Sequence, residues 1–329
     1  MRIENYIPTR QYRYYYNSLS TNDKRAYDEM LSGLLNFSTS IRCNCHHSYV
    51  HKLYYYVRYD IPELFYVKTI KVRYSTINNN LCTLLPEYRF EKDTSCQVLD
   101  AIEQKYKSFI LKTLKLNDEE KEKAIHDILV RLVKYKDVDA PYSHEAPGAL
   151  LYNIGVCEGM AKAFKFLSDR VGLKSLVVAG TSNVHGNPNG HAWNIVWLDR
   201  ACYHIDVTFD STISDGCTRY DYFNLSDEEI GSNHQWECDI PACMNSYAFY
   251  RKQGLFFDKK SDFIEFLKTS SRIKRTIVFQ IAKFNYPTNE IVNTISNLIQ
   301  TNIYCNFVQQ RRYTLSYNPN RMVFQVNIL

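Results

Sequence analysis

Hydrophobic residues in the first third of the chain recur at helical spacing in three stretches. This spacing predicts helices that begin after Thr21-Asn22, extend over 49–59, and run from Val98 to Ile110. Short apolar runs between these stretches predict strands, which lie at 37–42, 64–67, 70–75 and 81–84. We therefore expect residues 1–116 to form an N-terminal α+β region, and this region carries no catalytic signature.

The middle of the chain, residues 117–253, combines two strong helix patterns with several strands. Asn117 and Glu120 have the spacing of a capping box at the start of the first helix. Apolar residues from Met160 to Val171 recur at helical spacing, and the glycine that follows is a natural stop for this second helix. The strands predicted after it lie at 174–180, 190–197 and 202–208.

The last part of the chain, residues 254–329, shows the order helix, strand, helix, strand, strand. The predicted helices lie at 261–267 and 288–299, and the predicted strands at 276–282, 313–317 and 322–328. The turn residues Asn318-Pro319-Asn320 between the last two strands are typical of a hairpin. This order suits a small α+β module.

Cys157 lies at the start of the second central helix. Unpaired backbone N–H groups and the helix dipole favour an anion at this position, so the thiolate form of a cysteine is favoured there. Gly155 and Gly159 beside it are expected to leave room for the backbone of a substrate. Taken alone, Cys157 fits better as a buried structural cysteine, which is the usual state of a free cysteine.

His191 and Asp206 lie in two consecutive predicted strands. A two-residue turn at Leu198-Asp199 would place them directly opposite each other, within reach of their side chains, whereas a three-residue loop would break this pairing. A carboxylate beside His191 would fix its tautomer and stabilise the imidazolium. The imidazole could then hold Cys157 as a thiolate and protonate a leaving amine. The alternative for His191 and Asp206 is a polar pair without chemistry.

Three segments that contain these residues resemble the transglutaminase-like superfamily, and bacterial members of it in particular. They are Gly155-Val156-Cys157-Glu158-Gly159, Gly190-His191-Ala192-Trp193-Asn194 and Tyr203-His204-Ile205-Asp206-Val207-Thr208. The resemblance runs from about residue 117 to about 250. It departs from the family mildly at Thr208-Phe209-Asp210, where the family often has Trp-Asp after Asp-Val-Thr.

The resemblance implies an α+β fold with a papain-like core, in which the nucleophile helix packs on an antiparallel sheet, plus N-terminal and C-terminal α+β additions. It assigns Cys157 as nucleophile, His191 as base and Asp206 as the orienting residue. The backbone N–H of Cys157 is expected to bind the oxyanion, and Asn153 or Tyr152 is the candidate for a second donor. Trp193 is expected near the substrate, and together with Trp197 it would exclude water from the imidazole.

Several functional alternatives stay open at this point. The expected partner is a protein or peptide substrate, and the acyl group could pass to water, as in a protease or amidase, or to an amine, as in a transglutaminase. A non-catalytic peptide-binding protein that keeps the fold is the alternative from another class. The net charge of +5 gives no strong nucleic-acid bias, although clusters among the 27 tyrosines could stack on bases.

The remaining expectations concern metals, cofactors and location. The cluster Cys43-Asn44-Cys45-His46-His47 offers metal-ligand atoms, but adjacent residues chelate poorly, so we expect no metal and no cofactor. The N-terminus lacks the apolar segment of a signal peptide, and no stretch reaches membrane-spanning length. These features predict a cytoplasmic protein with reduced thiols. The oligomeric state stays open.

Overall fold

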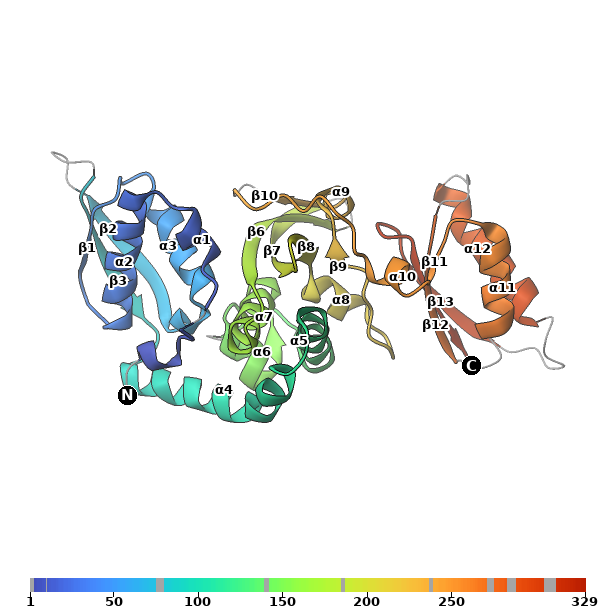
Figure 1. Cartoon of the computed structure of the whole chain (residues 1–329), viewed down its shortest axis with the longest axis horizontal. Helices are drawn as coiled ribbons and strands as arrows, with labels where there is room; N and C mark the ends of the chain where they lie inside the picture. The colour runs from blue at the N-terminus through green and yellow to red at the C-terminus, as the bar shows by residue number, and fades with distance from the viewer. Residues whose placement is uncertain are drawn as a thin grey trace.

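The chain folds into three sheet-containing parts that follow one another along the longest axis of the molecule (Figure 1). The structure is a computed structural model that describes residues 3–9, 11–74, 80–138, 142–184, 187–236, 239–270, 275–282, 288–304 and 312–329. Helices and mostly antiparallel sheets occur in each part, which confirms the α+β class predicted from the sequence.

The N-terminal part has a three-stranded antiparallel sheet in the order β1-β3-β2, with helices packed around it. Its elements are η1 (Ile3–Tyr6), α1 (Tyr14–Ser18), α2 (Thr21–Leu35), β1 (Ile41–Cys43), α3 (Val50–Asp60), η2 (Pro62–Leu64), β2 (Val67–Tyr74), β3 (Cys82–Tyr88) and α4 (Lys92–Thr113). The two short strands predicted at 64–67 and 70–75 are wrong in detail, because β2 is one strand with an irregularity between Val67 and Thr69. The long helix α4 runs beneath this part toward the centre of the molecule (Figure 1).

The central part contains a five-stranded antiparallel sheet in the order β10-β6-β7-β8-β9. Its elements are α5 (Asp118–Leu132), β4 (Lys134–Tyr135), α6 (Ala146–Tyr152), β5 (Ile154–Gly155), α7 (Cys157–Val171), β6 (Ser175–Val184), β7 (Asn187–Leu198), β8 (Ala201–Ile205), α8 (Val207–Ile213), β9 (Phe223–Leu225), α9 (Asp227–Ile230), β10 (His234–Trp236) and α10 (Phe249–Lys252). The capping box at the start of α5 and the glycine stop of α7 are present as predicted.

Helix α7 is fixed to the sheet by apolar packing and by one buried amide. Met160, Phe164 and Leu167 are fully buried on the face of the helix that the apolar spacing predicts. From β7, the side chain of Asn194 donates hydrogen bonds to the carbonyl of Ala161 in the helix (3.0 Å) and to a carbonyl of β6 (3.1 Å). Cys157, the first residue of α7, is therefore held at a fixed position relative to the sheet.

The β7–β8 hairpin turns one residue later than predicted. Leu198 pairs with Ala201, so the turn residues are Asp199 and Arg200, and Asp199 adopts a positive φ of 52°. Strand β7 begins at Asn187 and pairs with β6 through Asn189 and Gly190, so it is longer than the strand predicted at 190–197.

The C-terminal part has a four-stranded sheet in the order β11-β12-β14-β13. Its elements are β11 (Phe256–Phe257), α11 (Lys260–Ser270), β12 (Thr276–Ile281), α12 (Thr288–Tyr304), β13 (Tyr313–Asn318) and β14 (Val323–Ile328). The predicted hairpin around Asn318-Pro319-Asn320 is present as β13 and β14. Its buried apolar residues form a hydrophobic cluster separate from the rest of the chain.

The N-terminal and central parts, by contrast, share one hydrophobic cluster and a buried ionic contact. Arg58 of α3 pairs with Glu145, and Glu145 also accepts a hydrogen bond from Lys162 of α7 (2.9 Å). All three side chains are buried. The domain boundaries predicted near residues 116 and 253 stay predictions.

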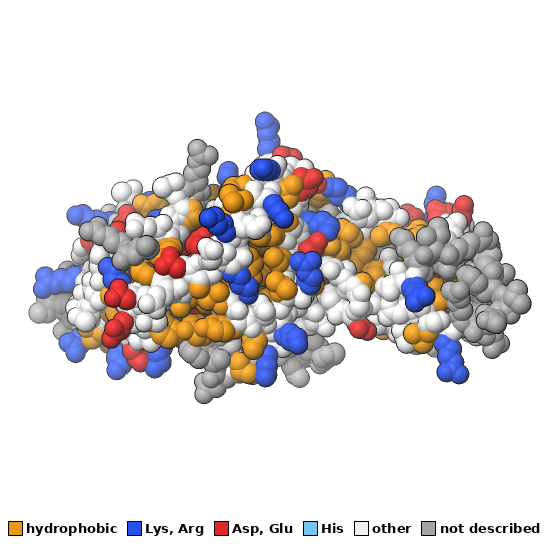
Figure 2. Space-filling view, turned by 90° about the horizontal axis from the view of Figure 1, so that it is seen from below, with side chains coloured by type: hydrophobic (Ala, Val, Ile, Leu, Met, Phe, Trp, Pro, Cys, Tyr) orange, Lys and Arg blue, Asp and Glu red, His pale blue; other side chains and the backbone are white. Residues whose placement is uncertain are grey.

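The surface carries charges of both signs. On the face shown in Figure 2, Lys and Arg side chains are interspersed with Asp and Glu and with hydrophobic side chains. Within the described ranges, no helix is both long enough and apolar enough to cross a membrane.

Candidate active site

Cys157 is the first residue of α7 and is half-buried. The chain enters the helix through Val156, which is extended and donates its backbone N–H to the carbonyl of Ser143 (2.9 Å). A side chain at Gly159 would lie only 2.3 Å from that same carbonyl oxygen. The expectation that this glycine leaves room for a substrate backbone is therefore wrong, because it accommodates the protein's own loop.

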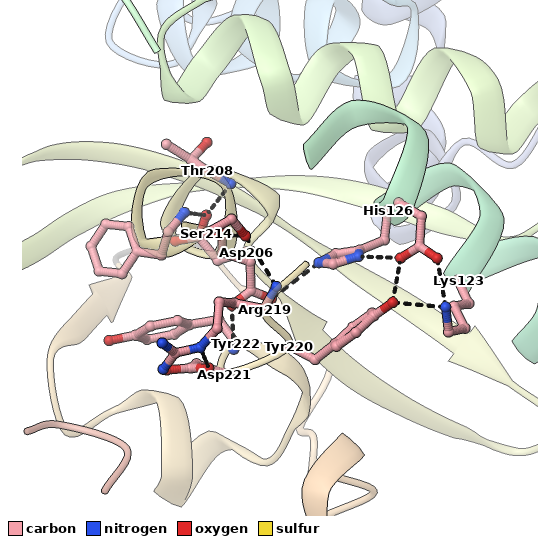
Figure 3. Close-up of polar contacts among 12 residues, drawn as sticks. Lys123, His126, Asp206, Thr208, Ser214, Arg219, Tyr220, Asp221 and Tyr222 are labelled. Carbon is pink, nitrogen blue, oxygen red and sulfur yellow. Dashed lines mark hydrogen bonds and ion pairs between the residues drawn. The ribbon is translucent and has the colours of Figure 1, made fainter. Parts of the chain in front are cut away.

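Asp206 is the N-cap of α8 and not a strand residue as predicted. One carboxylate oxygen accepts hydrogen bonds from the backbone N–H groups of Thr208 (2.9 Å) and Phe209 (3.1 Å), as Figure 3 shows. The carboxylate is an effective cap because it satisfies N–H groups that have no partner inside the helix. Strand β8 ends at Ile205, so the structure reaches the predicted neighbourhood of His191 through a helix cap and not through cross-strand pairing.

The imidazole of His191 donates from Nε2 to the second carboxylate oxygen of Asp206, at 2.6 Å. Both side chains are buried. Burial alone would lower the pKa of His191, but the adjacent Asp206 carboxylate and the Cys157 side chain raise it to about 10. Burial likewise works to raise the pKa of Asp206, and His191 overcomes it and holds that pKa well below its usual range.

The side chain of Cys157 lies close enough to this imidazole to raise its pKa. Because Nε2 is engaged by Asp206, Nδ1 is the ring nitrogen left for the sulfur. The structure thus brings together the three residues singled out from the sequence. Their positions come from a helix start, a strand and a helix cap, three separate elements of the central part.

A second histidine, His234, contacts the same carboxylate, and this contact was not predicted from the sequence. Its Nε2 lies 3.1 Å from the Asp206 oxygen that His191 also contacts, and its Nδ1 lies 2.8 Å from the side-chain oxygen of Asn233. Burial lowers the pKa of His234. No sequence pattern indicates this contact, because it depends on the pairing of β10 with the edge of β6.

Aromatic rings enclose the imidazole. Trp193 is buried and lies nearly parallel to His191, with 5.9 Å between ring centroids, and Phe209 lies 4.8 Å from the same ring. Trp197 was also expected to shield His191, but its ring packs against Tyr12 and Tyr14 of the N-terminal part. The predicted contact of Trp193 with substrate stays a prediction.

The two residues proposed as oxyanion donors lie just before β5. Asn153 ends α6 with a positive φ of 55°, and its side-chain oxygen accepts a hydrogen bond from Lys105 (3.2 Å). Tyr152 is 53% exposed and stacks on Tyr142 with 5.0 Å between ring centroids. Their role as donors stays a prediction.

A buried polar network attaches α8 to α5 (Figure 3). His126 lies between Asp127 (3.0 Å) and Asp210 (3.1 Å), and it is completely buried. Burial would lower the pKa of His126, but the two carboxylates raise it. Burial raises the pKa of Asp210 to about 7 despite His126. Because Asp206 caps the helix that carries Asp210, this network helps to hold Asp206 in position.

Tyr220 and Lys123 complete the outer end of this network. The hydroxyl of Tyr220 donates to Asp127 (2.9 Å) and accepts from Lys123 (2.7 Å). The Tyr220 ring also stacks on the imidazole of His126, with 4.9 Å between centroids. Both polar contacts and ring packing therefore fix the orientation of His126.

Two groups of ligand-type side chains in the described part of the chain are close enough to hold a metal ion. They are His191, Asp206 and His234, and His204, Asp227 and Cys243. In the second group, the indole N–H of Trp193 donates to Nδ1 of His204 (3.0 Å), so Nε2 of His204 carries the proton and donates to Asp227 (2.8 Å). A metal would have to displace that proton. The predicted absence of a metal stays a prediction.

A comparison with protein families finds a match that includes the residues of this site. The model of the transglutaminase-like superfamily matches residues 110–207, which contain Cys157, His191 and Asp206. The chain therefore contains a transglutaminase-like domain, and the family resemblance seen in the sequence is confirmed. A comparison with curated proteins gave no match.

Three solved structures are similar to part of this chain at low identity. A candidate cysteine protease from Cytophaga hutchinsonii is 14% identical with a TM-score of 0.29, and the match covers 43% of this chain and 62% of that one. A structure described as a TGase is 17% identical with a TM-score of 0.27, over 43% of this chain and 44% of that one. A candidate protease from Parabacteroides distasonis is 10% identical with a TM-score of 0.24, over 42% and 36%. This chain thus spans less than two thirds of each.

Proposed function

We propose that this chain is a cysteine-nucleophile acyl-transfer enzyme that acts on peptide or glutamine-type amide bonds through a thioester. The observation that carries the proposal is the position of the His191 imidazole. It is held by the Asp206 carboxylate at 2.6 Å on one side and faces the Cys157 sulfur on the other. A raised pKa of His191 favours an imidazolium, which stabilises a thiolate beside it.

The proposed reaction begins when the Cys157 thiolate attacks the carbonyl carbon of the amide. The backbone N–H of Cys157 lies at the start of α7 and stabilises the oxyanion, with Asn153 or Tyr152 as the proposed second donor. His191 then protonates the departing amine or ammonia, the C–N bond breaks, and a thioester remains on Cys157. In the second half, neutral His191 takes a proton from the incoming nucleophile, and the thiolate leaves.

The incoming nucleophile decides the class of product. Water gives a protease or amidase, and a lysine-type amine gives a transamidase. In both cases the proposed partner is a protein or peptide, the catalytic region is 117–253, and the regions 1–116 and 254–329 are additions to it.

The first test measures the alkylation rate of each cysteine by iodoacetamide, followed by mass spectrometry. We expect Cys157 to react at least about tenfold faster than Cys217, which is half-buried to a similar degree and serves as the internal reference. His191→Gln should remove this advantage, because glutamine cannot carry the positive charge that stabilises the thiolate. Equal rates for the two cysteines in the wild-type protein would contradict the proposal.

The second test identifies the product. Wild-type protein and Cys157→Ala are incubated with a glutamine-containing peptide library, with and without a primary amine, and masses are compared. A mass gain equal to the amine minus ammonia indicates transamidation, whereas the replacement of ammonia by water or chain cleavage indicates hydrolysis. Turnover that survives in Cys157→Ala would assign the chemistry to another residue.

A further inference from the structure

A cavity of about 520 Å³ lies between the central and C-terminal parts, next to the candidate active site. Five chain segments form it: the end of β6, helix α8, the residue just before β9, the residues just before β10, and the β13–β14 turn. Its described lining residues are Asn183, Phe209, Thr212, Ile213, Tyr222, Ser232, Asn233, Tyr317, Asn318, Pro319 and Asn320. Its volume is in the range of pockets that take small ligands or side chains.

Phe209 connects this cavity to the reacting groups. Its ring lines the cavity and also lies 4.8 Å from the ring of His191 and 4.9 Å from that of His234. Its backbone N–H donates to Asp206. The cavity therefore begins about one aromatic ring away from the imidazole, which is close enough for a side chain of a substrate whose carbonyl lies at Cys157.

The C-terminal part supplies one wall of the cavity at a fixed position. Tyr222 is buried, and its hydroxyl accepts a hydrogen bond from the side chain of Asn233 (2.9 Å). Asn318 donates to Asp221 (3.0 Å), so the β13–β14 turn is attached to the central part. Tyr317 in the same turn remains 37% exposed and can contact a ligand.

The chemistry of the walls selects for an uncharged, flat group. Phe209, Tyr222 and Tyr317 offer three aromatic rings, and the polar lining groups are carboxamides and hydroxyls. No described lining residue carries a charge, so a charged ligand group would lose its hydration there without gaining an ionic partner. Aromatic pairs contribute about 0.5–1.5 kcal/mol beyond the burial of area, which favours an aromatic group over an aliphatic one.

We propose that this cavity binds an aromatic side chain of the peptide substrate, close to the amide that Cys157 attacks. The C-terminal part is thereby a specificity element, because its turn completes the site. This inference rests on the proposed function and adds the substrate class to it.

The test uses two kinds of reagent on the full-length protein. Peptidyl electrophiles that alkylate thiols are prepared with one variable side chain, which is Phe, Gln, Lys or Ala, and the labelling rate of Cys157 is measured for each. Iodoacetamide, which has no side chain to bind, reports the reactivity of Cys157 itself. We expect the Phe reagent to react at least about tenfold faster than the Lys and Ala reagents, since 1.4 kcal/mol corresponds to a factor of ten.

Substitutions in the β13–β14 turn test whether the preference for the Phe reagent arises in this cavity. Tyr317→Ala should slow the Phe reagent about fivefold and leave the iodoacetamide rate unchanged. Asn320→Asp should raise the Lys rate relative to the Phe rate, because it adds a carboxylate to an uncharged site. Tyr74→Ala serves as the matched control, since Tyr74 is an exposed tyrosine (60%) on β2, an N-terminal strand that does not line the cavity.

The outcomes separate the two proposals. If iodoacetamide shows no preference for Cys157, the proposed function fails. If iodoacetamide labels Cys157 rapidly but the Phe reagent has no advantage, or Tyr317→Ala slows every reagent equally, the proposed function stands and the aromatic site is overturned.

Discussion

At the scale of single residues, the buried carboxylate of Asp206 has hydrogen-bond partners for both of its oxygens. Asp206 accepts two backbone hydrogen bonds at the start of α8 and two more from the imidazoles of His191 and His234. A buried charge without such partners is strongly disfavoured. The four donors therefore keep Asp206 ionised and fix its orientation toward His191.

Two variants can distinguish the hydrogen bond from His234 to Asp206 from the packing of the His234 ring. We expect His234→Leu to reduce the alkylation rate of Cys157 about tenfold, because hydrogen bonds to charged groups are worth about 1.5–3 kcal/mol. It should also shift the acid limb of the rate–pH profile to higher pH, since Asp206 loses a donor that lowers its pKa. His234→Gln keeps an N–H donor and should restore most of the rate. A loss of equal size in both variants, with no shift in pH, would indicate packing alone.

The ion pair of His191 and Asp206 also predicts how stability depends on pH. The pKa of His191 is raised to about 10, so its contribution is complete below about pH 6.5 and disappears as the pH rises through 10. The pKa of Asp206 is depressed, so its contribution is present above about pH 4 and disappears as the pH falls.

We therefore expect the difference in unfolding free energy between wild type and His191→Gln to be largest between about pH 5 and 6.5. It should shrink by about 1–4 kcal/mol toward pH 10, at about 1.4 kcal/mol per unit of pKa shift. Urea denaturation at a series of pH values measures it. A difference that is constant from pH 5 to pH 10 would show that the two groups do not form an ion pair in the folded protein.

At the scale of elements, the start of α7 is defined by close contact with the loop before α6. Val156 donates to the carbonyl of Ser143, and Gly159 faces the same carbonyl one turn into the helix. The contact is made by backbone atoms, which cannot rotate away as a side chain can. The position of Cys157 at the N-terminus of α7 thus depends on a glycine two residues after it.

Gly159→Ala should destabilise the protein by about 1–3 kcal/mol, because overpacking against backbone forces a shift. It should also slow the alkylation of Cys157, since the helix start must move. Gly190→Ala is the control: Gly190 adjoins His191, but a Cβ there meets no atom within 4 Å. Thermal denaturation of both variants measures the effect, and similar stability of the two would contradict the argument.

Sequence patterns predicted the elements with long apolar repeats better than those with short ones. The start of α7 at Cys157 and the capping box of α5 follow from local residues and are observed. The end of β8 was predicted three residues too late, because Val207 and Thr208 favour strands intrinsically. The N-cap contacts of Asp206 override that preference.

At the scale of the whole molecule, the C-terminal part is attached through buried polar contacts. Arg321 is buried and donates to the backbone carbonyls of Asp221 (3.2 Å) and Glu229 (2.9 Å). The carboxylate of Asp221 also pairs with Arg219, and it accepts a hydrogen bond from Tyr250 (3.0 Å). These contacts set the position of the β13–β14 turn, which forms one wall of the cavity beside the candidate active site.

Arg321→Ala should weaken this attachment by about 2 kcal/mol, because two buried carbonyls lose their donors. Arg312→Ala, at an exposed arginine just before β13, should have little effect. Limited thermolysin digestion of the folded proteins measures the change, and we expect faster cleavage between the central and C-terminal parts only in Arg321→Ala. Equal cleavage of both variants would show that Arg321 does not hold the turn.

The sequence by itself singled out Cys157, His191 and Asp206 as candidate site residues, because each lies in a local pattern that is readable over a few residues: a helix start, a strand and a conspicuous Asp-Val-Thr segment. Only the tertiary structure decided the second histidine on Asp206, the burial of His126 and the aromatic cavity. These features join segments that are far apart in the chain, and their contacts depend on strand pairing and on the docking of the C-terminal part, which no local periodicity encodes.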